Sequence, residues 1–262
     1  WRNIEKKFYM TSYKSMKQIV SRHNPEIKAV CELHHRKGRK QKQLFIAEGL
    51  RIIQTFLEHH HPLVSLYACQ EQVSLAKTLV QENYITRVTE EIMSKMSTAT
   101  SPSGLLAVFS IPSSPTWDQL TSGIILAQIA DPGNMGTLIR TAAAMNFKTV
   151  VVVDGCDPWS PKVVQASAGT IAGIHIFSCS WQELIQHKKS DIPLCALVVS
   201  GGKPLQDIIG KQALLIVGNE AQGMPSAWIA QCDERVTIPM PGNTESLNAA
   251  VAGSIALYLM AT

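Results

Sequence analysis

Three loops of this 262-residue chain combine glycine and proline with polar side chains that could do chemistry. The first loop, residues 131–136, reads Asp-Pro-Gly-Asn-Met-Gly and leads into a segment of helical spacing, which is expected to carry Arg140 about one turn from its start. The second, residues 217–224, places glycines on both sides of a single carboxylate, Glu220. The third, residues 238–248, is rich in proline and glycine and leads into the apolar C-terminal segment.

These residue types suit binding and proton chemistry. The guanidinium of Arg140 presents a fixed fork of donors that suits a phosphate or a developing oxyanion. It gives up its proton so reluctantly that we favour orientation and electrostatic stabilisation as its role. Glu220 could take a proton directly or through water, or it could hold Arg140 in place, and these alternatives stay open. Ser246 could position a ligand or serve only as a helix N-cap.

Several common sites are absent from the sequence. No G-x-G-x-x-G follows the first strand of either half, which disfavours a dinucleotide site. The sequence has no P-loop motif, so a P-loop is excluded. It has no G-x-S-x-G motif, which argues against an α/β hydrolase. The histidine run at 59–61 has no partners at zinc spacing, so no metal site is expected. The six scattered cysteines, several in apolar runs, predict buried thiols in a reducing compartment and thus a cytoplasmic protein. No apolar run is long enough to span a bilayer, so no membrane contact is expected.

The segments around the three loops alternate between strand and helix patterns. We predict an N-terminal α/β unit at 16–111, a proline- and serine-rich linker at 112–122 and a second α/β unit at 123–262, after an extension or cloning remnant at 1–15. Val150–Val153 is a continuous apolar strand, which indicates a parallel sheet with both faces buried. Ligands bind such sheets beyond the carboxyl ends of the strands, where the three loops lie. In the first unit we expect strands at 44–47, 63–68 and 105–109, and helices at 16–33 (interrupted at Pro25), 48–59 and 74–81. In the second we expect strands at 124–129, 149–153, 174–177, 194–199, 213–217 and 235–238, and helices at 137–146, 161–168, 181–187, 225–231 and 246–260.

Positive charge is concentrated near the N-terminus. Residues 1–50 hold 12 of the 24 Lys and Arg residues but only four of the 20 acidic residues. The densest run, residues 34–42, presents several cations within a Debye length of about 10 Å and suits a polyanion, although a merely solvated loop is the alternative. Its glycine and its lack of apolar periodicity predict a loop. The candidate RNA contacts in this run are Arg36, Lys37, Arg39 and Lys40.

Taken together and in this order, the three loops resemble the three motifs of the SpoU branch of the SPOUT RNA methyltransferases. The resemblance covers residues 123–262, and three separated motifs agree in sequence and spacing. The basic unit before the linker resembles the family's N-terminal substrate-binding domain in its size, its basic run and the pattern Phe-Ile-Ala-Glu-Gly at 45–49. The resemblance implies an α/β protein with a C-terminal parallel-sheet domain tied in a deep trefoil knot, and a smaller N-terminal α/β RNA-binding domain.

The resemblance also implies an activity, the transfer of a methyl group from S-adenosylmethionine to a ribose 2′-hydroxyl of structured RNA. We favour rRNA over tRNA, because relatives that act on tRNA often lack the N-terminal domain. No metal is needed, since the sulfonium is already a good leaving group. The residues implied at the reacting hydroxyl are Arg140, Asn134, Glu220, Ser246 and Asn248, and those implied to hold the cofactor are Gly218, Ile238, Leu247 and Met240.

Two readings compete with this one. An RNA-binding module of the same fold could have lost catalysis, but Asn134, Arg140, Glu220 and Asn248 are all present and argue against it. Methylation of a base is disfavoured by the SpoU type of the motifs. The small residues of the last helix permit close packing, either within the knot or at the interface of a homodimer. In such a homodimer each site would include residues of the partner subunit.

Overall fold

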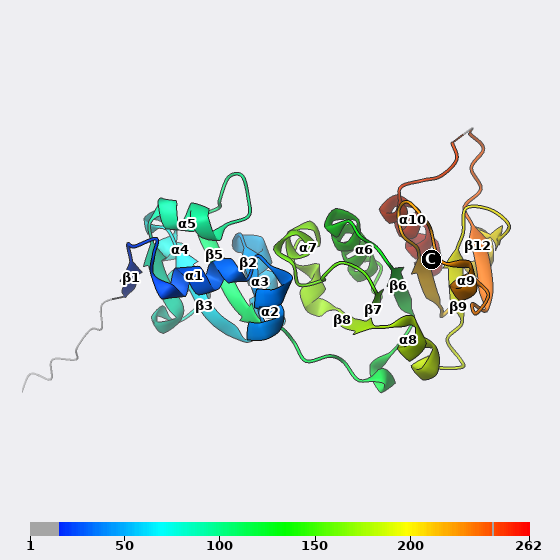
Figure 1. Cartoon of the computed structure of the whole chain (residues 1–262), viewed down its shortest axis with the longest axis horizontal. Coiled ribbons are helices and arrows are strands. Elements are labelled where there is room, and N and C mark those ends of the chain that lie inside the picture. Colours follow the sequence, from blue (N-terminus) through cyan, green and yellow to red (C-terminus); the bar gives the residue numbers. More distant parts are fainter. Residues whose placement is uncertain (1–15, 243) are drawn as a thin grey trace, which may run out of the picture.

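This computed structural model describes residues 16–242 and 244–262, and contains two sheets (Figure 1). The prediction made for residues 1–15 lies outside the described residues. The first sheet is mixed and forms the N-terminal domain. Strands β1, β4 and β3 pair in parallel, whereas β5 pairs antiparallel with both β3 and β2. Its strands in spatial order are β1 (Lys17–Ile19), β4 (Ile85–Val88), β3 (Leu63–Ala68), β5 (Leu105–Ser110) and β2 (Leu44–Glu48).

Two features of this domain differ from the sequence predictions. The expected helix over 16–33 is instead a short strand, β1, followed by α1 (Pro25–Glu32). Proline at the first helical position and Asn24, whose side chain accepts a hydrogen bond from the N–H of Glu26, start the helix there. Strand β4 and helix α5 (Glu90–Met96) were not predicted. Two further helices of this domain are α3 (Leu50–Glu58) and α4 (Val73–Leu79).

The basic run is a helix and the prediction of a loop is wrong. Residues Arg36–Lys42 form α2, which ends at Gln43 in the left-handed conformation. Gly38 does not break the helix. A Cβ at this position would overlap the carbonyl oxygen of Glu32, so the close crossing of α2 over the end of α1 requires glycine. The run lacks apolar periodicity because its one buried position is filled by a charged residue, Arg39.

The second sheet has seven strands, all parallel, as the continuous apolar strands predict. Alternate residues of its central strands point to opposite faces. One face carries Leu126 and Val152 in a core with α6 (Pro132–Ala144) and α10 (Ala249–Ala261), and the other carries Ile125 and Val151 in a core with α8 (Trp181–His187). The spatial order is β10 (Lys203–Pro204), β12 (Glu234–Thr237), β9 (Leu194–Leu197), β11 (Leu214–Val217), β6 (Gly123–Ala127), β7 (Thr149–Val153) and β8 (His175–Cys179). Helices α7 (Pro161–Ala166) and α9 (Ser226–Ile229) complete this C-terminal domain.

Two helices that flank the candidate loops start elsewhere than predicted. Helix α6 begins at Pro132, five residues early, because the Asp131 side chain accepts a hydrogen bond from the N–H of Asn134 and caps it. Arg140 therefore lies two turns into the helix and not one. Helix α10 begins at Ala249, three residues late, and its N-cap is Asn248 and not Ser246. None of the described helices has the length and apolar character needed to cross a membrane.

Candidate functional site

Three strand-end loops meet at the carboxyl edge of the parallel sheet. Strands β11 and β6 are neighbours, so the loops that follow them lie side by side. The carboxylate of Glu220, in the loop after β11, accepts hydrogen bonds from the backbone N–H groups of Ala130 (3.3 Å) and Asp131 (3.2 Å), in the loop after β6. It also accepts one from the side-chain amide of Asn134 at 3.0 Å. A single carboxylate thus joins two of the three loops.

The third loop joins the same cluster through Asn248. Its Nδ2 donates a hydrogen bond to Oδ1 of Asn134 at 3.2 Å. Because the Nδ2 of Asn134 donates to Glu220, its oxygen is free to accept from Asn248. Asn248, Asn134 and Glu220 therefore form a continuous hydrogen-bonded chain across residues that are 114 and 86 positions apart in sequence. The structure brings together these three predicted site residues.

Glu220 is an ionised acid at neutral pH. Partial burial raises the pKa of Glu220, but the hydrogen bonds from the Asn134 amide and from backbone N–H groups outweigh this effect, and the net pKa lies below its ordinary value. A carboxylate whose pKa is lowered is a weaker base than an ordinary one. Its electrostatic effect is therefore a permanent negative charge at the junction of the loops.

The second loop is shaped by a residue that the sequence analysis missed. Asn219 donates through Nδ2 to the carbonyl oxygen of Gln128 at 2.9 Å, and its Oδ1 accepts from the N–H groups of Ala221 and Gln222. Its position between Gly218 and Glu220, directly after a buried strand, was the available signal. The backbone of Asn219 also pairs with that of Gly223, which has φ +67°.

Gly218 is required by this loop. A Cβ at Gly218 would lie 2.6 Å from the carbonyl carbon of Gly223 and 2.7 Å from the N atom of Met224. The loop folds back so closely on the end of β11 that no side chain fits there. The same close folding leaves the backbone of Gly218 on the wall of a pocket.

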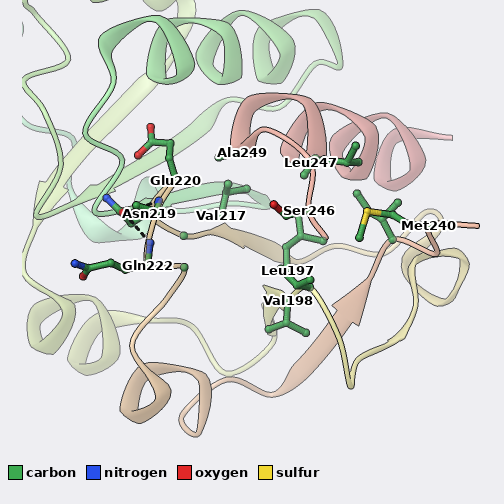
Figure 2. A pocket seen from close by; sticks show the side chains of 16 residues that line it. Leu197, Val198, Val217, Asn219, Glu220, Gln222, Met240, Ser246, Leu247 and Ala249 are labelled. Atoms are coloured by element: carbon green, nitrogen blue, oxygen red, sulfur yellow. Dashed lines mark hydrogen bonds between the residues drawn. The ribbon is translucent and has the colours of Figure 1, made fainter. Parts of the chain in front are cut away.

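This pocket has a volume of about 330 Å³, within the range of small-molecule sites. Figure 2 shows it between the loop after β11 and the N-terminal end of α10, with Glu220 toward one end and Met240 toward the other. Leu197 to Val199, at the end of β9 and directly after it, form an apolar part of the lining that was not predicted. The predicted site residues that line the pocket are Gly218, Glu220, Ile238, Met240, Ser246 and Leu247.

Arg140 is the predicted residue that the structure does not bring into this cluster. It is exposed on α6, six residues or about 9 Å of helix beyond Asn134. Within residues 16–242 and 244–262 it makes no hydrogen bond or ion pair. One alternative from the sequence was that Glu220 holds Arg140 in place, but the carboxylate of Glu220 instead accepts a hydrogen bond from Asn134. Arg140 is therefore free to meet a group from outside this chain.

The basic run separates into two kinds of residue. Arg36, Lys37 and Lys40 are exposed on α2, and we call them the outward cations. Arg39 is only 3% exposed, and its guanidinium is bonded to Asp157 of the C-terminal domain. The prediction that Arg39 contacts RNA is thereby corrected, because its donors are already occupied inside the protein.

Two family models match this chain. Residues 122–258 match the SpoU rRNA Methylase family, and residues 24–107 match the MRM3-like substrate binding domain. Among curated proteins, the chain is 27% identical to the 23S rRNA (guanosine(2553)-2′-O)-methyltransferase RlmP of Bacillus subtilis, over 93% of this chain and 98% of that protein. It is 28% identical to the 23S rRNA (uridine(2479)-2′-O)-methyltransferase of Streptomyces viridochromogenes, over 86% of this chain and 85% of that protein.

Solved structures agree with this relationship. The AdoMet-bound rRNA methyltransferase from Sinorhizobium meliloti superposes with a TM-score of 0.84 at 28% identity, covering 93% of this chain and 97% of that one. With this coverage the match extends over both domains. The family model spans the three motifs and more than half of the chain, so this protein belongs to the SpoU rRNA methylase family.

Proposed function

We propose that this protein transfers a methyl group from S-adenosylmethionine to a ribose 2′-hydroxyl of structured RNA, with rRNA as the substrate class. The observation that carries the proposal is the hydrogen-bonded chain Asn248–Asn134–Glu220 beside the 330 Å³ pocket. The curated relatives in Bacillus subtilis and Streptomyces viridochromogenes are rRNA 2′-O-methyltransferases, and the Sinorhizobium meliloti structure holds AdoMet.

The pocket fits such a cofactor in chemistry and size. Leu197, Ile238 and Leu247 offer apolar contact to a base, and the uncovered backbone at Gly218 offers hydrogen-bonding groups. The ionised Glu220 on the same wall favours a positively charged group in the pocket. When bound, S-adenosylmethionine supplies a methyl group already activated on a sulfonium.

The residues around the pocket position the ribose and stabilise the charge that develops during the reaction. Asn134 and Asn248 are held by hydrogen bonds and keep their amides in fixed orientations to position the ribose, and Ser246 adds a hydroxyl from the pocket wall. We assign Glu220 to holding Asn134 and the first loop, because its carboxylate already accepts hydrogen bonds from the Asn134 amide and from the backbone N–H groups of Ala130 and Asp131. Water then takes the proton of the ribose hydroxyl, while the guanidinium of Arg140 stabilises the developing negative charge on its oxygen.

A homodimer would explain the exposed position of Arg140. Val251, Ile255 and Tyr258 are 49%, 38% and 56% exposed and form an apolar stripe on α10 at helical spacing. Helix α10 packs on α6, where Thr141 and Ser254 are hydrogen-bonded at 3.0 Å. A partner subunit covering the stripe would therefore lie beside Arg140, so that each site could use residues of both subunits.

The stripe gives this part of the proposal its own test. Tyr258→Asp should convert a dimer to a monomer in sedimentation velocity and reduce methyl transfer. The matched control is Tyr84→Asp, which changes another exposed tyrosine on the N-terminal domain. A Tyr258→Asp protein that remains dimeric would remove the stripe from the interface.

RNA binding is assigned to the N-terminal domain and to the gap beside it. The outward cations carry positive charge on α2. Arg36 and Lys40 line a cavity of about 800 Å³ together with Trp159 and His175 of the C-terminal domain. Cations together with an aromatic side chain suit an RNA backbone and its bases. The cavity therefore supports an RNA path that runs between the domains.

Three finer features belong to the proposal. The predicted domain boundaries, with residues 112–122 as the linker, agree with sheets that use residues 17–110 and 123–237. A deep trefoil knot is supported by the course of the chain after β12, which lies near one edge of the sheet and is followed by α10 packed on α6 and on β11. The six unpaired thiols support the predicted cytoplasmic location.

Mapping ribose methylation across total RNA, with and without the protein, tests the function directly. We expect one or a few positions, in rRNA, to gain a methyl group only when both protein and S-adenosylmethionine are present. Cofactor binding measured by calorimetry accompanies the experiment. RNA binding with no methylated position would favour the alternative, a module of the same fold without catalysis.

A further inference from the structure

An ion pair between the buried Arg39 and the partly buried Asp157 joins the two domains. The Nε and Nη2 atoms of Arg39 both donate to Oδ2 of Asp157, at 2.8 and 2.6 Å. The Nη1 atom donates to the carbonyl oxygens of Leu33 (2.6 Å) and His34 (3.0 Å). Four of the five N–H groups of the guanidinium are therefore used within the protein. This degree of satisfaction is what a charge needs in order to be buried without a large penalty.

Asp157 lies at the edge of the sheet that carries the candidate site. It belongs to the loop after β7, the neighbour of β6, and its other oxygen accepts a hydrogen bond from the N–H of Trp159 at 3.0 Å. The preceding residue, Cys156, donates its N–H to the carbonyl oxygen of Ile129 at 2.9 Å. Ala130 and Asp131, which follow Ile129 in the chain, donate their backbone N–H groups to the carboxylate of Glu220. A short series of hydrogen bonds thus links the Arg39–Asp157 pair to the loops around Glu220.

The remaining contacts between the domains would keep them together without this pair. Phe45 of β2 lies against Trp159 with ring centroids 4.9 Å apart, and a ring nitrogen of His61 lies 2.9 Å from the carbonyl oxygen of Ala172. Apolar and aromatic contacts of this kind resist separation, and the ion pair adds two directional hydrogen bonds that favour one orientation. Loss of the pair should therefore loosen the relative orientation of the domains and leave each domain folded.

The orientation matters because α2 also carries the outward cations. The same helix turns Arg39 into the protein and the outward cations toward solvent. Any movement of α2 relative to Asp157 moves those cations relative to the pocket. RNA held by them would then reach the site in many orientations, and misplacement of the reacting groups by about 1 Å can cost about 100-fold in rate.

We propose that the Arg39–Asp157 pair is a clasp that holds RNA bound on α2 in register with the methyl-transfer site. In this assignment Arg39 is a positioning residue and makes no contact with RNA. The inference rests on the proposed function. It assigns RNA binding to the outward cations of α2 and the orientation of the bound RNA to Arg39.

The test compares binding with reaction in Arg39→Ala, Asp157→Ala and the double variant. At saturating RNA and cofactor, each should lower the single-turnover rate by about tenfold or more. RNA and cofactor dissociation constants should stay within about threefold of wild type. The single-turnover rate of the double variant should be no lower than that of either single variant, because each single substitution already removes the same ion pair. Arg39→Lys keeps the positive charge but lacks the planar set of guanidinium N–H donors, so its rate should lie between those of Arg39→Ala and wild type.

A second readout follows the domains themselves. Spin labels introduced as non-natural residues at the exposed positions Ser74 and Asp191 report the distance between the domains while leaving the six native cysteines in place. The distribution should broaden in Arg39→Ala and Asp157→Ala. Lys188→Ala is the matched control, since it breaks the Lys188–Asp233 ion pair inside one domain and should leave rate and distribution unchanged.

Several results would overturn the clasp. Weakened RNA binding in Arg39→Ala but not in Asp157→Ala would mean that Arg39 contacts RNA. Wild-type rates and distributions in both variants would mean that the other contacts suffice. If the alanine variants do not bind cofactor, Arg39→Lys and Asp157→Asn carry the same comparison. A wild-type protein that methylates no RNA would overturn the proposed function, whereas the distance distribution would still decide whether the pair orients the domains.

Discussion

The carboxylate of Glu220 can be replaced by an amide of nearly the same shape in the variant Glu220→Gln. One carboxylate oxygen accepts from the Asp131 N–H and from Asn134, and the other accepts from the Ala130 N–H. A glutamine can keep its oxygen on the first pair, but its NH₂ group then faces the N–H of Ala130, and two donors meet. The variant also removes the negative charge that strengthens all three bonds.

The magnitude follows from these contacts. A hydrogen bond to a charged group contributes about 1.5–3 kcal/mol, and the lower figure applies here because Glu220 is exposed and solvent replaces part of what is lost. If the network holds Asn134 and Asn248 in position for the reaction, about 1.5 kcal/mol corresponds to a roughly tenfold slower methyl transfer. Single-turnover methylation with saturating RNA and cofactor measures it. Glu245→Gln, which removes the same charge from the third loop, is the matched control.

The pH dependence provides a second check on the same variant. The folded-state pKa of Glu220 is below its ordinary value, so its contribution to stability is fully present above a pH of about 4.3 and is lost as the pH falls through the folded pKa. The difference in unfolding free energy between wild type and Glu220→Gln should therefore be constant near neutrality and shrink only in acid. A Glu220→Gln rate within about threefold of wild type would refute the positioning argument.

Three further outcomes are expected. Arg140→Ala should slow single-turnover methylation by about 2.7–4 kcal/mol in barrier with the fold intact, and Arg140→Lys should recover only part of it; a rate within about threefold of wild type would remove Arg140 from the mechanism. Replacing the outward cations with Ala should flatten the salt dependence of RNA binding without changing cofactor affinity, and an unchanged salt slope would mean that they are only solvated. Gly253→Ala should destabilise the protein by about 1–3 kcal/mol in chemical unfolding, because the added Cβ would lie 2.5 Å from Leu138 and 2.9 Å from Val217. Gly242→Ala, with open space around it, is the control, and equal stabilities of the two variants would contradict the packing argument.

The prediction of family and of parallel sheet came from features that are local in sequence. A run such as Val150–Val153 has no polar position to face solvent, so it indicates a strand buried on both faces, and the structure confirms this. The three loops were recognised because each follows a predicted strand and combines turn residues with a polar side chain. Two of these strands, β6 and β11, are buried on both faces. Parallel strands place their carboxyl ends together. The hydrogen bonds that Asn134 donates to Glu220 and accepts from Asn248 follow from that geometry.

Two of the errors arose where another part of the chain decides the local structure, and two arose from local helix capping. Residues 17–19 have enough apolar character for a helix, but they form a strand because they pair with β4, nearly 70 residues later. Gly38 suggests a turn in isolation, whereas in the folded chain it is the residue that lets α2 cross the end of α1. The helix starts at Pro132 and Ala249 depended on which nearby side chain captures the free N–H groups, and several candidates were available at each.

Arg39 shows this division within a single helix. The sequence by itself determined that residues 36–42 carry a dense positive charge, because charge is a property of residue type. Only the tertiary structure decided that Arg39 turns inward while its neighbours face solvent, since its carboxylate partner, Asp157, lies 118 residues away on another domain. A buried charge is stable only where a partner and the remaining acceptors are in place, and no pattern within seven residues contains that information.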